Sequence, residues 1–478
     1  MKKSDFLRAT YPYFFYRGYS YQFEKGNLGI SFDFSLPPDI TFQPKIVLEN
    51  VSPESEERIG KSVLKNLIFH LGMVELLSYW KVACSPEIII QAGFLTNQQI
   101  RWWKNFILDG MGQFFYENNV DFRKKDFLSI KNAYLRDERT NEKEGATRHE
   151  KSLSKKVLIP VGGGKDSIVT LELLKDHFDV RGFVLNPAKS QRMIIRIAGL
   201  KDALWVHRTI DSKLLELNHK GYLNGHTPFS AYLAFLSVFA AILFDCKYIA
   251  LSNERSSNEG NGAYLGKMIN HQHSKSFSFE KKFHEYSKKY LAKNVEYFSF
   301  LRPLYELQIA RLFSRYPQYL PVFMSCNEAY KTASGTKKPT GKWCGKCSKC
   351  LFVFAVLYPF FQEKQLIKIF GPNLFENKSL IPLMEQLVGE RGFKPFECVG
   401  TKRETLAAFY LSSQKQKEKP SLLIEYARRK IFPKQRNLAR RSENILHAWE
   451  FNHLIPTEFV KLLKNESSKQ DAYQGLGK

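Results

Sequence analysis

The amino terminus lacks the apolar run of a secretory signal peptide. Met1-Lys2-Lys3-Ser4-Asp5 meets an acidic residue at once, and no apolar stretch follows it. A signal peptide needs an apolar segment of about 7–15 residues after its basic start. We therefore expect a cytoplasmic protein.

The sequence also lacks an uncharged run long enough to span a membrane. The longest, residues 227–244, is rich in alanine and phenylalanine. It is slightly shorter than the about 20 apolar residues that a transmembrane helix needs. Because it lies between alternating strand and helix patterns, it is expected to be a buried core helix.

Cysteine is scarce and unevenly placed. The chain has seven cysteines in 478 residues, and three of them fall between positions 344 and 350. That spacing is typical of metal ligands and not of a disulfide framework. The formal net charge of +25 suits a polyanionic partner such as RNA, a nucleotide-linked substrate or an acidic membrane surface. Charge alone does not choose among these.

No internal repeat is visible, and the chain divides by composition and pattern. Short β-branched runs at 157–161, 180–185, 204–209 and 248–252 alternate with helical stretches. This rhythm predicts an α/β fold with a parallel sheet. The predicted segments are a mixed α+β amino-terminal domain (1–135), a polar linker (136–155), an α/β domain (156–325), a four-cysteine module (326–365) and a helical, basic carboxyl-terminal region (366–478).

A glycine loop follows the strand predicted at 157–161 and precedes a helix expected from Ser167 to Leu174. Its glycines let backbone N–H groups approach phosphate oxygens, and the helix end and Lys165 add positive charge. The spacing excludes both the Gly-x-x-x-x-Gly-Lys-Ser/Thr loop and the dinucleotide fingerprint. A plain turn is the alternative, but strand, helix and loop together favour a nucleotide site. The loop is Gly162-Gly163-Gly164-Lys165-Asp166-Ser167.

This loop resembles that of the pyrophosphate-loop family, whose motif is Ser-Gly-Gly-x-Asp-Ser. Gly162 stands where the family has its first serine, and Gly163, Gly164, Asp166 and Ser167 match. The resemblance implies a core like that of the adenine-nucleotide alpha hydrolases. It also implies that ATP is cleaved between its α and β phosphates, so that AMP is transferred to the substrate and pyrophosphate leaves.

A polar loop follows the strand at 248–252, at the edge where open α/β sheets bind ligands. Glu254 and Glu259 offer carboxylates for Mg²⁺ or for proton transfer, although an ordinary solvated loop is the alternative. A second short loop, 224–228, contains His226, a candidate acid, base or phosphate partner. The candidates for substrate binding are Asn253, Arg255 and Ser256.

The cysteine cluster Cys344-Gly345-Lys346-Cys347-Ser348-Lys349-Cys350 places three thiols at two-residue intervals, and Cys326 can supply a fourth ligand. Structural zinc takes four ligands, often all cysteine. We therefore predict a closed, structural Zn²⁺ site. A racemase that uses two facing thiols is the less favoured alternative, because closely spaced thiols chelate one ion.

The chain is similar over most of its length to the ATP-dependent UDP-N-acetylmuramoyl-L-alanyl-L-glutamate epimerases of bacterial peptidoglycan synthesis. The glycine loop and the cysteine cluster carry the resemblance together with three further stretches. These are Asn224-Gly225-His226-Thr227-Pro228, Ser252-Asn253-Glu254-Arg255-Ser256 and Lys394-Pro395-Phe396-Glu397-Cys398-Val399-Gly400, and Leu77-Ser78-Tyr79-Trp80-Lys81 also fits.

The resemblance implies an enzyme that uses ATP and Mg²⁺ on a small UDP-linked peptide. Adenylation of the glutamate carboxylate makes its α-proton more acidic, one group removes that proton, and another returns it from the opposite face. The candidates for these two transfers are His226, Glu254, Glu259 and His271, and Arg255, Lys267 and Arg302 are possible substrate clamps.

Two alternatives stay open at this point. The loop and cysteines are also similar to 7-cyano-7-deazaguanine synthase, which makes a transfer-RNA- or nucleobase-modifying enzyme the runner-up. That enzyme is much smaller and leaves the first 150 residues and the basic tail unexplained. The second alternative is a non-catalytic, zinc-stabilised protein that binds nucleic acid.

Overall fold

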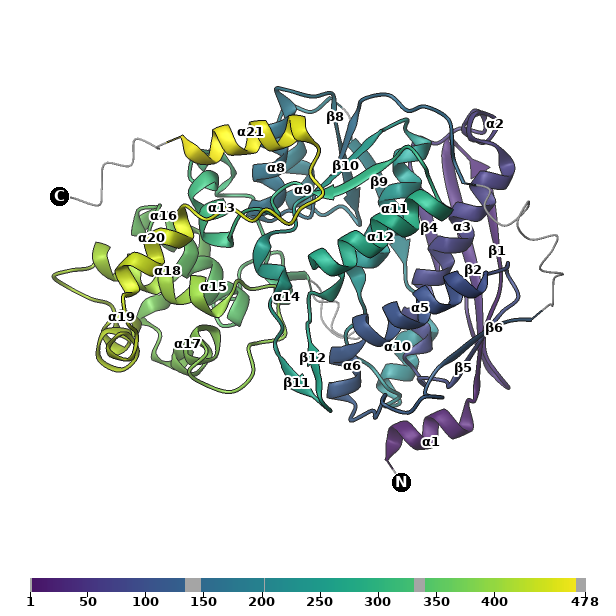
Figure 1. Cartoon of the computed structure of the whole chain (residues 1–478), viewed down its shortest axis with the longest axis horizontal. Coiled ribbons are helices and arrows are strands. Elements are labelled where there is room, and N and C mark those ends of the chain that lie inside the picture. Colours follow the sequence, from purple (N-terminus) through teal and green to yellow (C-terminus); the bar gives the residue numbers. More distant parts are fainter. Residues whose placement is uncertain (1, 134–147, 202, 331–339, 470–478) are drawn as a thin grey trace.

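The computed structural model describes residues 2–133, 148–201, 203–330 and 340–469 (Figure 1). Much of the predicted linker, residues 136–147, therefore lies outside the described residues. Within these ranges, every helix is too short or too polar to cross a membrane.

One eleven-stranded sheet runs through the molecule, and most of its neighbouring strands are parallel. Its path follows the order β13-β10-β7-β8-β9-β4-β2-β1-β5-β6, with β3 paired to β2. The strands are β1 (Tyr13–Glu24), β2 (Asn27–Leu36), β3 (Ile40–Phe42), β4 (Lys45–Leu48), β5 (Glu87–Ile90), β6 (Ser129–Asn132), β7 (Val157–Pro160), β8 (Val180–Leu185), β9 (Ala203–Thr209), β10 (Tyr248–Leu251) and β13 (Glu296–Ser299). A separate hairpin pairs β11 (Gly262–Tyr264) with β12 (Lys267–Ile269).

The parallel half of the sheet has its topological switch between β7 and β10. From β7 the chain proceeds to β8 and β9 on one side, and then to β10 and β13 on the other. Crevices that bind ligands form at the carboxyl ends of strands at such a switch point. The loops after β7 and β10, which the sequence singled out, therefore lie side by side.

The first strands of the chain belong to the same sheet. Strand β4 pairs antiparallel with β9, and Ile46 lies opposite Arg208. The five-stranded stretch β4-β2-β1-β5-β6 then extends the sheet away from the switch point. The domain boundaries expected from composition stay predictions, but the sheet combines strands of the first (1–135) and third (156–325) predicted segments.

Helices cover both faces of the parallel half, and alternate residues of each strand enter two cores. Leu158 and Ile249 belong to one core, which also contains α3 and α11, whereas Val157 and Ile159 belong to the other, which contains α8 and α13. This two-residue alternation is that of a strand buried on both faces. The helices of the first two-thirds are α1 (Lys3–Thr10), α2 (Glu54–Ile59), α3 (Lys61–Glu75), α4 (Leu77–Trp80), α5 (Asn97–Gly110), α6 (Gly112–Glu117), α8 (Lys165–Lys175), α9 (Lys189–Ile197), α10 (Ser212–His219), α11 (Phe229–Leu243), α12 (Phe277–Tyr290) and α13 (Glu306–Phe313).

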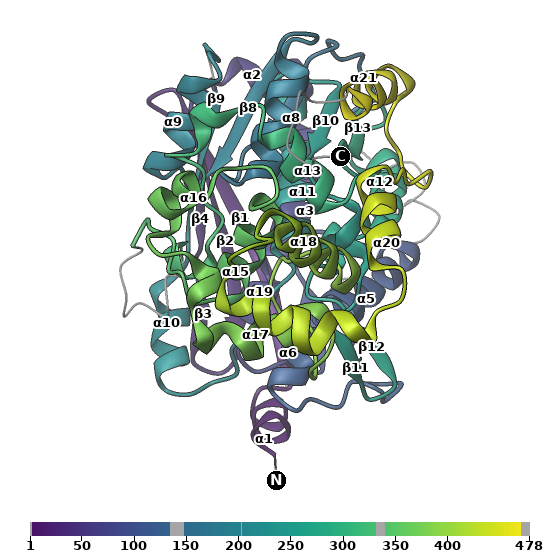
Figure 2. The ribbon, with the colours of Figure 1, turned by 90° about the vertical axis from the view of Figure 1, so that its left-hand side faces the viewer.

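The carboxyl-terminal helices form a layer that packs on α13 and, in Figure 2, lies in front of the sheet. Helix α15 packs against α13 and α18 in the second core, so this layer is continuous with the parallel half. These helices are α14 (Asn327–Tyr330), α15 (Ser348–Leu357), α16 (Glu363–Phe370), α17 (Ile381–Val388), α18 (Lys402–Lys415), α19 (Leu422–Tyr426), α20 (Leu438–Leu446) and α21 (Thr457–Ser468).

The predicted parallel sheet and the buried helix are confirmed. The strands expected at 157–161, 180–185, 204–209 and 248–252 are present to within a residue at each end, and residues 227–244 contain the buried helix α11. The helix after the glycine loop begins earlier than predicted, at Lys165 instead of Ser167. Gly164 is already extended, with φ −84° and ψ 167°, and serves as its N-cap.

Candidate functional site

The glycine loop is held from both sides where β7 ends and α8 begins. Val161 N donates to Phe183 O at 2.8 Å, which continues the β7–β8 pairing into the loop. Gly163 has a φ of +94°, and a Cβ there would lie 3.3 Å from Gln191 Nε2, so this position requires glycine. On the other side, Met324 N donates to Gly163 O at 2.8 Å.

Gly162 is the one position that departs from the pyrophosphate-loop motif. It is exposed, and a Cβ built on it would have no atom within 4 Å. A serine would therefore fit here. The departure removes a hydroxyl group from the loop and does not reflect a backbone that demands glycine.

Lys165 points into the protein and not into solvent. Its side chain is 3% exposed, and Nζ forms ion pairs with Asp166 and Glu306. Burial alone would lower the pKa of Lys165, but the two carboxylates outweigh burial and raise it. Ser167, in the same turn, donates its hydroxyl hydrogen to Gly164 O at 3.0 Å.

Three carboxylates meet beside the loop. Asp166, Glu254 and Glu306 each bring one oxygen within 4.8 Å of the others. Asp166 lies in the first turn of α8, Glu254 follows β10, and Glu306 is the first residue of α13. Carboxylate oxygens are preferred ligands of Mg²⁺, so this carboxylate cluster could hold a divalent cation.

Mutual repulsion and neighbouring lysines set the protonation of the carboxylate cluster. Burial, and then the charge of Glu306, raise the pKa of Glu254 to about 7. Burial and Glu306 also raise the pKa of Asp166. Burial acts on Glu306 in the same direction, but Lys165 and Lys349 outweigh it and lower the pKa of Glu306. Glu254 is therefore often protonated near pH 7, and a bound cation would release that proton.

Two predicted catalytic histidines that are 45 positions apart in the sequence are neighbours in space. The ring centroids of His226 and His271 are 4.4 Å apart. Nδ1 of His271 lies 2.5 Å from Gln113 Oε1. Burial, followed by the effects of His271 and Lys81, lowers the pKa of His226 well below its ordinary value. His226 is therefore a neutral imidazole at pH 7, and the same shift makes it a weaker base than an exposed histidine.

A half-buried lysine links the histidines to the carboxylate cluster. Lys275 Nζ lies 3.3 Å from Cys398 Sγ, and its charge lowers the pKa of both Glu254 and His226. Neither Lys275 nor Cys398 was assigned a role from the sequence. Glu306 was also missed, although a carboxylate at the first residue of a helix just beyond a parallel strand is a usable signal.

Two of the predicted substrate ligands are engaged by carboxylates of the carboxyl-terminal region. The Arg255 guanidinium lies 4.6 Å from the Tyr305 ring centroid and 3.5 Å from Glu450 Oε2. The Ser256 hydroxyl donates to Glu404. Their roles in substrate binding stay predictions.

The remaining predicted residues of this loop also have protein partners. Asn253 Nδ2 donates to Ser299 Oγ at 3.0 Å. Glu259 Oε1 accepts hydrogen bonds from Lys394 Nζ at 3.2 Å and from Lys402 N at 3.1 Å. Glu259 thus stands apart from the carboxylate cluster and anchors the segment that enters α18.

Of the possible clamps, Arg302 is fully buried and supports the loop after β10. Its Nη1 donates to Glu254 O at 2.7 Å, and its Nη2 lies 2.7 Å from Glu280 Oε2. Lys267 Nζ lies 2.6 Å from Asp109 Oδ1. Arg302 therefore positions Glu254 through its backbone.

The four predicted metal ligands come together. The sulfur atoms of Cys326, Cys344, Cys347 and Cys350 all lie within 4.8 Å of one another, and Cys344 Sγ is 3.6 Å from Cys350 Sγ. Zn–S bonds of about 2.3 Å in a tetrahedron place the sulfurs about 3.8 Å apart. This thiol cluster could therefore hold a metal ion, and its geometry is compatible with structural zinc.

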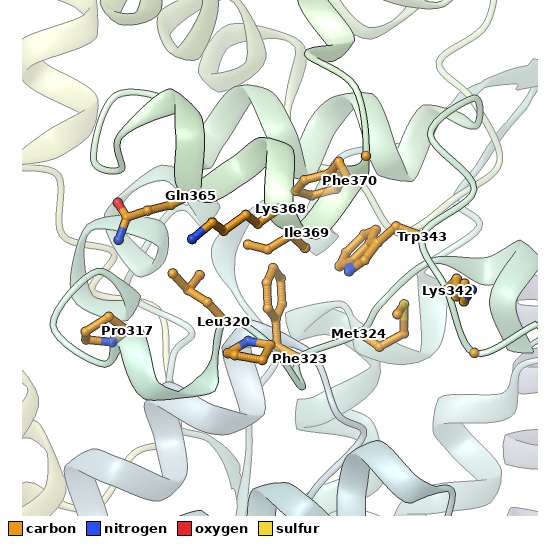
Figure 3. Close-up of a pocket in the computed structure, with 13 residues that line it drawn as sticks. Pro317, Leu320, Phe323, Met324, Lys342, Trp343, Gln365, Lys368, Ile369 and Phe370 are labelled. Atoms are coloured by element: carbon orange, nitrogen blue, oxygen red, sulfur yellow. The ribbon is translucent and has the colours of Figure 1, made fainter.

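A cavity of about 740 Å³ lies between the segment 317–324 and helix α16 (Figure 3). Leu320 and Phe323 face Lys368 and Ile369 of α16 across it, and Trp343 lies at one end. Trp343 is 8% exposed, and its Nε1 has no hydrogen-bond partner in the described part of the chain. The cavity adjoins the loop through Met324, which lines it and binds Gly163 O.

Comparison with known proteins identifies relatives over most of the chain. Residues 5–300 match the family model described as MurL N-terminal domain, and residues 322–442 match the MurL C-terminal domain. No solved structure matches the chain.

Three similar proteins carry the name UDP-N-acetyl-alpha-D-muramoyl-L-alanyl-L-glutamate epimerase. The protein of Xanthomonas oryzae pv. oryzae is 32% identical over 365 residues, which are 76% of this chain and 78% of that protein. The protein of Salinispora tropica is 33% identical over 397 residues, or 82% and 83% of the two chains. That of a Micromonospora species is 38% identical over 258 residues, or 54% and 57%. The chain therefore belongs to the MurL family.

Proposed function

We propose that this chain is an ATP-dependent epimerase of peptidoglycan synthesis. It converts the terminal L-glutamate of UDP-N-acetylmuramoyl-L-alanyl-L-glutamate to D-glutamate, with release of AMP and pyrophosphate. The observation that carries the proposal is the carboxylate cluster beside a glycine loop, in a chain whose relatives bear this epimerase's name.

The loop and the strand order support a pyrophosphate-loop core. Backbone N–H groups of residues 162–167 would bind the pyrophosphate part of ATP at the amino end of α8. Asp166, Glu254 and Glu306 would hold Mg²⁺, and a bound Mg²⁺ would supply positive charge to the phosphates of ATP. Lys165 neutralises two of these carboxylates, Asp166 and Glu306, before ATP arrives.

Adenylation answers the chemical difficulty of this epimerisation. The α-proton of a free glutamate carboxylate is very weakly acidic, because the resulting carbanion would lie beside a full negative charge. Joining the carboxylate to AMP removes that charge and converts the carboxylate into an ester-like acyl group. The α-proton beside this acyl group is more acidic. A base can then remove the proton, an acid can return it from the opposite face, and water releases AMP.

The proton-transfer groups predicted from the sequence fit this scheme to different degrees. His226 is neutral and paired with His271, so this pair is the best placed to accept or return a proton. Glu254 would serve as a metal ligand instead, because it belongs to the carboxylate cluster. Glu259 would anchor the segment before α18.

The wider environment suits a UDP-linked peptide. The net charge of +25 favours a substrate that carries a diphosphate and carboxylates. Asn253, Arg255 and Ser256 would contact it if their present partners were exchanged. A structural Zn²⁺ in the thiol cluster would fix α15. We place the reaction in the cytoplasm, where ATP is available.

The cavity in Figure 3 is the proposed site of the adenine ring. It adjoins the loop, and Phe323 and Trp343 offer aromatic faces for stacking. The free Nε1–H of Trp343 can donate to a ring nitrogen. Trp343→Phe, which keeps the stacking face, should raise KM for ATP about tenfold with kcat nearly unchanged. An unchanged KM for ATP would exclude adenine from this cavity.

A direct assay tests the whole proposal. Purified protein given the L-glutamate-terminated nucleotide, ATP and Mg²⁺ should form AMP and pyrophosphate, and chiral analysis of the hydrolysed product should find D-glutamate. No AMP with this substrate would refute the proposal. AMP release that depends on transfer RNA would point instead to a nucleobase-modifying enzyme.

A further inference from the structure

The segment 394–400 places a cysteine at the centre of the site. At its start, Lys394 is 1% exposed and forms an ion pair with Glu259. Glu397 Oε2 accepts a hydrogen bond of 2.8 Å from Lys349 N, in the first turn of α15. Lys349 Nζ also donates to Cys398 O. The backbone of Cys398 is therefore held rigidly on both sides.

Further contacts fix the other end of the segment. Val399 O accepts a hydrogen bond of 3.3 Å from Gln272 Nε2. Gln272 is 4% exposed, and its Oε1 lacks a partner within the described ranges. An unpaired buried acceptor next to a held cysteine is costly unless a ligand supplies a donor. This position is therefore suited to an N–H or O–H group of the substrate.

The Cys398 sulfur lies among cationic and imidazole groups. Lys275 Nζ is 3.3 Å from Sγ, and His271 also forms a hydrogen bond with the sulfur. Burial would raise the pKa of Cys398, but Lys275, then His271 and Lys349, lower it to about 5. Cys398 as a residue is partly exposed, and its lowered pKa favours the thiolate at pH 7.

The two other cysteines outside the thiol cluster differ from Cys398 in both burial and pKa. Cys84 and Cys246 are fully buried. Burial raises the pKa of each to about 12. Among these three, only Cys398 has a lowered pKa and is not fully buried as a residue, so its environment is specific to that position.

Cys398 also lies between the two groups of residues that the proposed reaction needs. Lys275 contacts its sulfur and acts on Glu254 and Asp166 of the carboxylate cluster. His271, which also acts on the sulfur, has its ring centroid 4.4 Å from that of His226. A glutamyl group activated at the carboxylate cluster would therefore place its α-carbon near a thiolate and an imidazole pair.

We propose that Cys398 exchanges a proton with the α-carbon of the activated glutamate. The inference rests on the proposed epimerase function and names one of its two proton-transfer groups. In one direction, the Cα–H bond breaks, its electron pair moves into the enolate of the acyl-adenylate, and the proton bonds to Cys398 sulfur. The electron pair of the enolate then forms a new Cα–H bond with a proton from the opposite face, where we place the His226–His271 pair. That proton leaves an N–H bond of a protonated imidazole and so returns the imidazole to its neutral form. Because His226 is neutral at rest, the pair first takes this proton up from solvent.

Charge balance also favours this role over a simple ion pair. When the thiolate takes the proton, Lys275 loses its nearest anion, and the enolate oxygen provides a new negative charge in the same site. The next turnover requires the thiol to lose its proton again, to water or through His271. The step needs no oxidant, reductant or additional co-substrate.

Isotope exchange in D₂O tests the proposal with Cys398→Ser and Cys398→Ala. The L- and D-glutamate-terminated nucleotides are each supplied with ATP and Mg²⁺. Substrate-dependent ATP–pyrophosphate exchange then measures adenylation, and mass spectrometry measures deuterium at Cα. Cys246→Ala is the control for loss of a cysteine, and thermal melting confirms that each variant is folded.

We expect both Cys398 variants to keep ATP–pyrophosphate exchange within about threefold of the unmodified protein. Deuterium incorporation from at least one isomer should fall by about 100-fold or more. Full incorporation from both isomers would overturn the inference and leave the epimerase proposal intact. Loss of ATP–pyrophosphate exchange in both folded variants would also overturn it, because Cys398 would then act before proton transfer. An unmodified protein that forms no AMP would refute both proposals.

Discussion

The carboxylate cluster and the thiol cluster both bring their ligand atoms close together, but they are built in opposite ways. In each, the atoms lie within 4.8 Å of one another. Three of the four thiols come from one run of seven residues, 344–350. The three carboxylates come from the ends of three different elements, after β7, after β10 and at the start of α13.

The two clusters also differ in their counter-charges. Lys165 pairs with two of the carboxylates, and Lys349 Nζ lies 3.8 Å from Glu306 Oε1. The thiols instead border the second apolar core. A site with its own lysines can stay folded without a metal ion and can bind one together with ATP, whereas thiols in an apolar setting need a resident ion. Lys349, between Cys347 and Cys350 in sequence, connects the two clusters.

The largest effect is expected from breaking the carboxylate cluster. Glu306→Gln removes the charge that pairs with Lys165 and contributes to the proposed metal site. AMP formation at saturating substrate should fall about 1000-fold, because charge stabilisation at such positions contributes 10²–10³ or more. The exposed residue Glu216 provides the control, Glu216→Gln. A decrease of less than tenfold would show that the cluster has no catalytic role.

Breaking the thiol cluster should affect stability before chemistry. In Cys347→Ser the zinc content, measured by mass spectrometry of the metal, should fall from about one to well below half an equivalent. The melting temperature should fall by roughly 5 °C or more. Cys246→Ala should keep its zinc. Unchanged zinc in Cys347→Ser would contradict a closed four-thiol site.

A third experiment tests what happens to a buried carboxylate that has no lysine partner. Burial, and then Glu306, raise the pKa of Glu404 to about 7, above the value of an unfolded glutamate. Between about pH 4.5 and 7 the unfolded chain releases this proton and the folded chain keeps it. The Glu404 contribution to stability is thus present at low pH and is lost as the pH rises through 7.

Urea unfolding at pH 5 and pH 8 measures this contribution. Glu404→Gln cannot ionise, so its loss of stability between the two pH values should be smaller than that of the unmodified protein, by up to about 3 kcal/mol. An equal pH dependence in both proteins would mean that Glu404 stays ionised when folded.

The smallest effect is expected from a carboxylate in the same loop but outside the cluster. Glu259 is held by Lys394 and Lys402 N, so Glu259→Gln keeps an oxygen acceptor and loses one ion pair. AMP formation should fall less than tenfold, which is less than about 1.4 kcal/mol. A decrease as large as that of Glu306→Gln would place Glu259 in the catalytic site.

Local spacing made the thiol cluster and the glycine loop predictable. Thiols separated by two residues can bind one metal ion regardless of the rest of the fold. Runs of β-branched residues indicate the parallel strands that position the glycine loop. The sequence indicated only part of the carboxylate cluster, because it did not reveal Glu306. Glu306 lies 52 positions after Glu254 and reaches the site because α13 packs against α8.

The contact between Lys275 and Cys398 and the pairing of β4 with β9 could not be predicted from local spacing either. Cys398 was visible as part of the 394–400 stretch, but its role depends on a lysine 123 positions away. The pairing of β4 with β9 joins residues more than 150 positions apart. Neither contact leaves a periodic pattern in the sequence, because each arises from tertiary packing.

That pairing has a consequence for the newly made chain. Ile46 lies opposite Arg208, so β4 has no partner on that side until the ribosome has released more than 200 residues. Until then β4 is an open strand edge that another nascent chain can join. Its first residue, Lys45, is an exposed charge of the kind that discourages such joining. Completion of β9, and not of the first 135 residues, is therefore the event that closes this half of the sheet during synthesis.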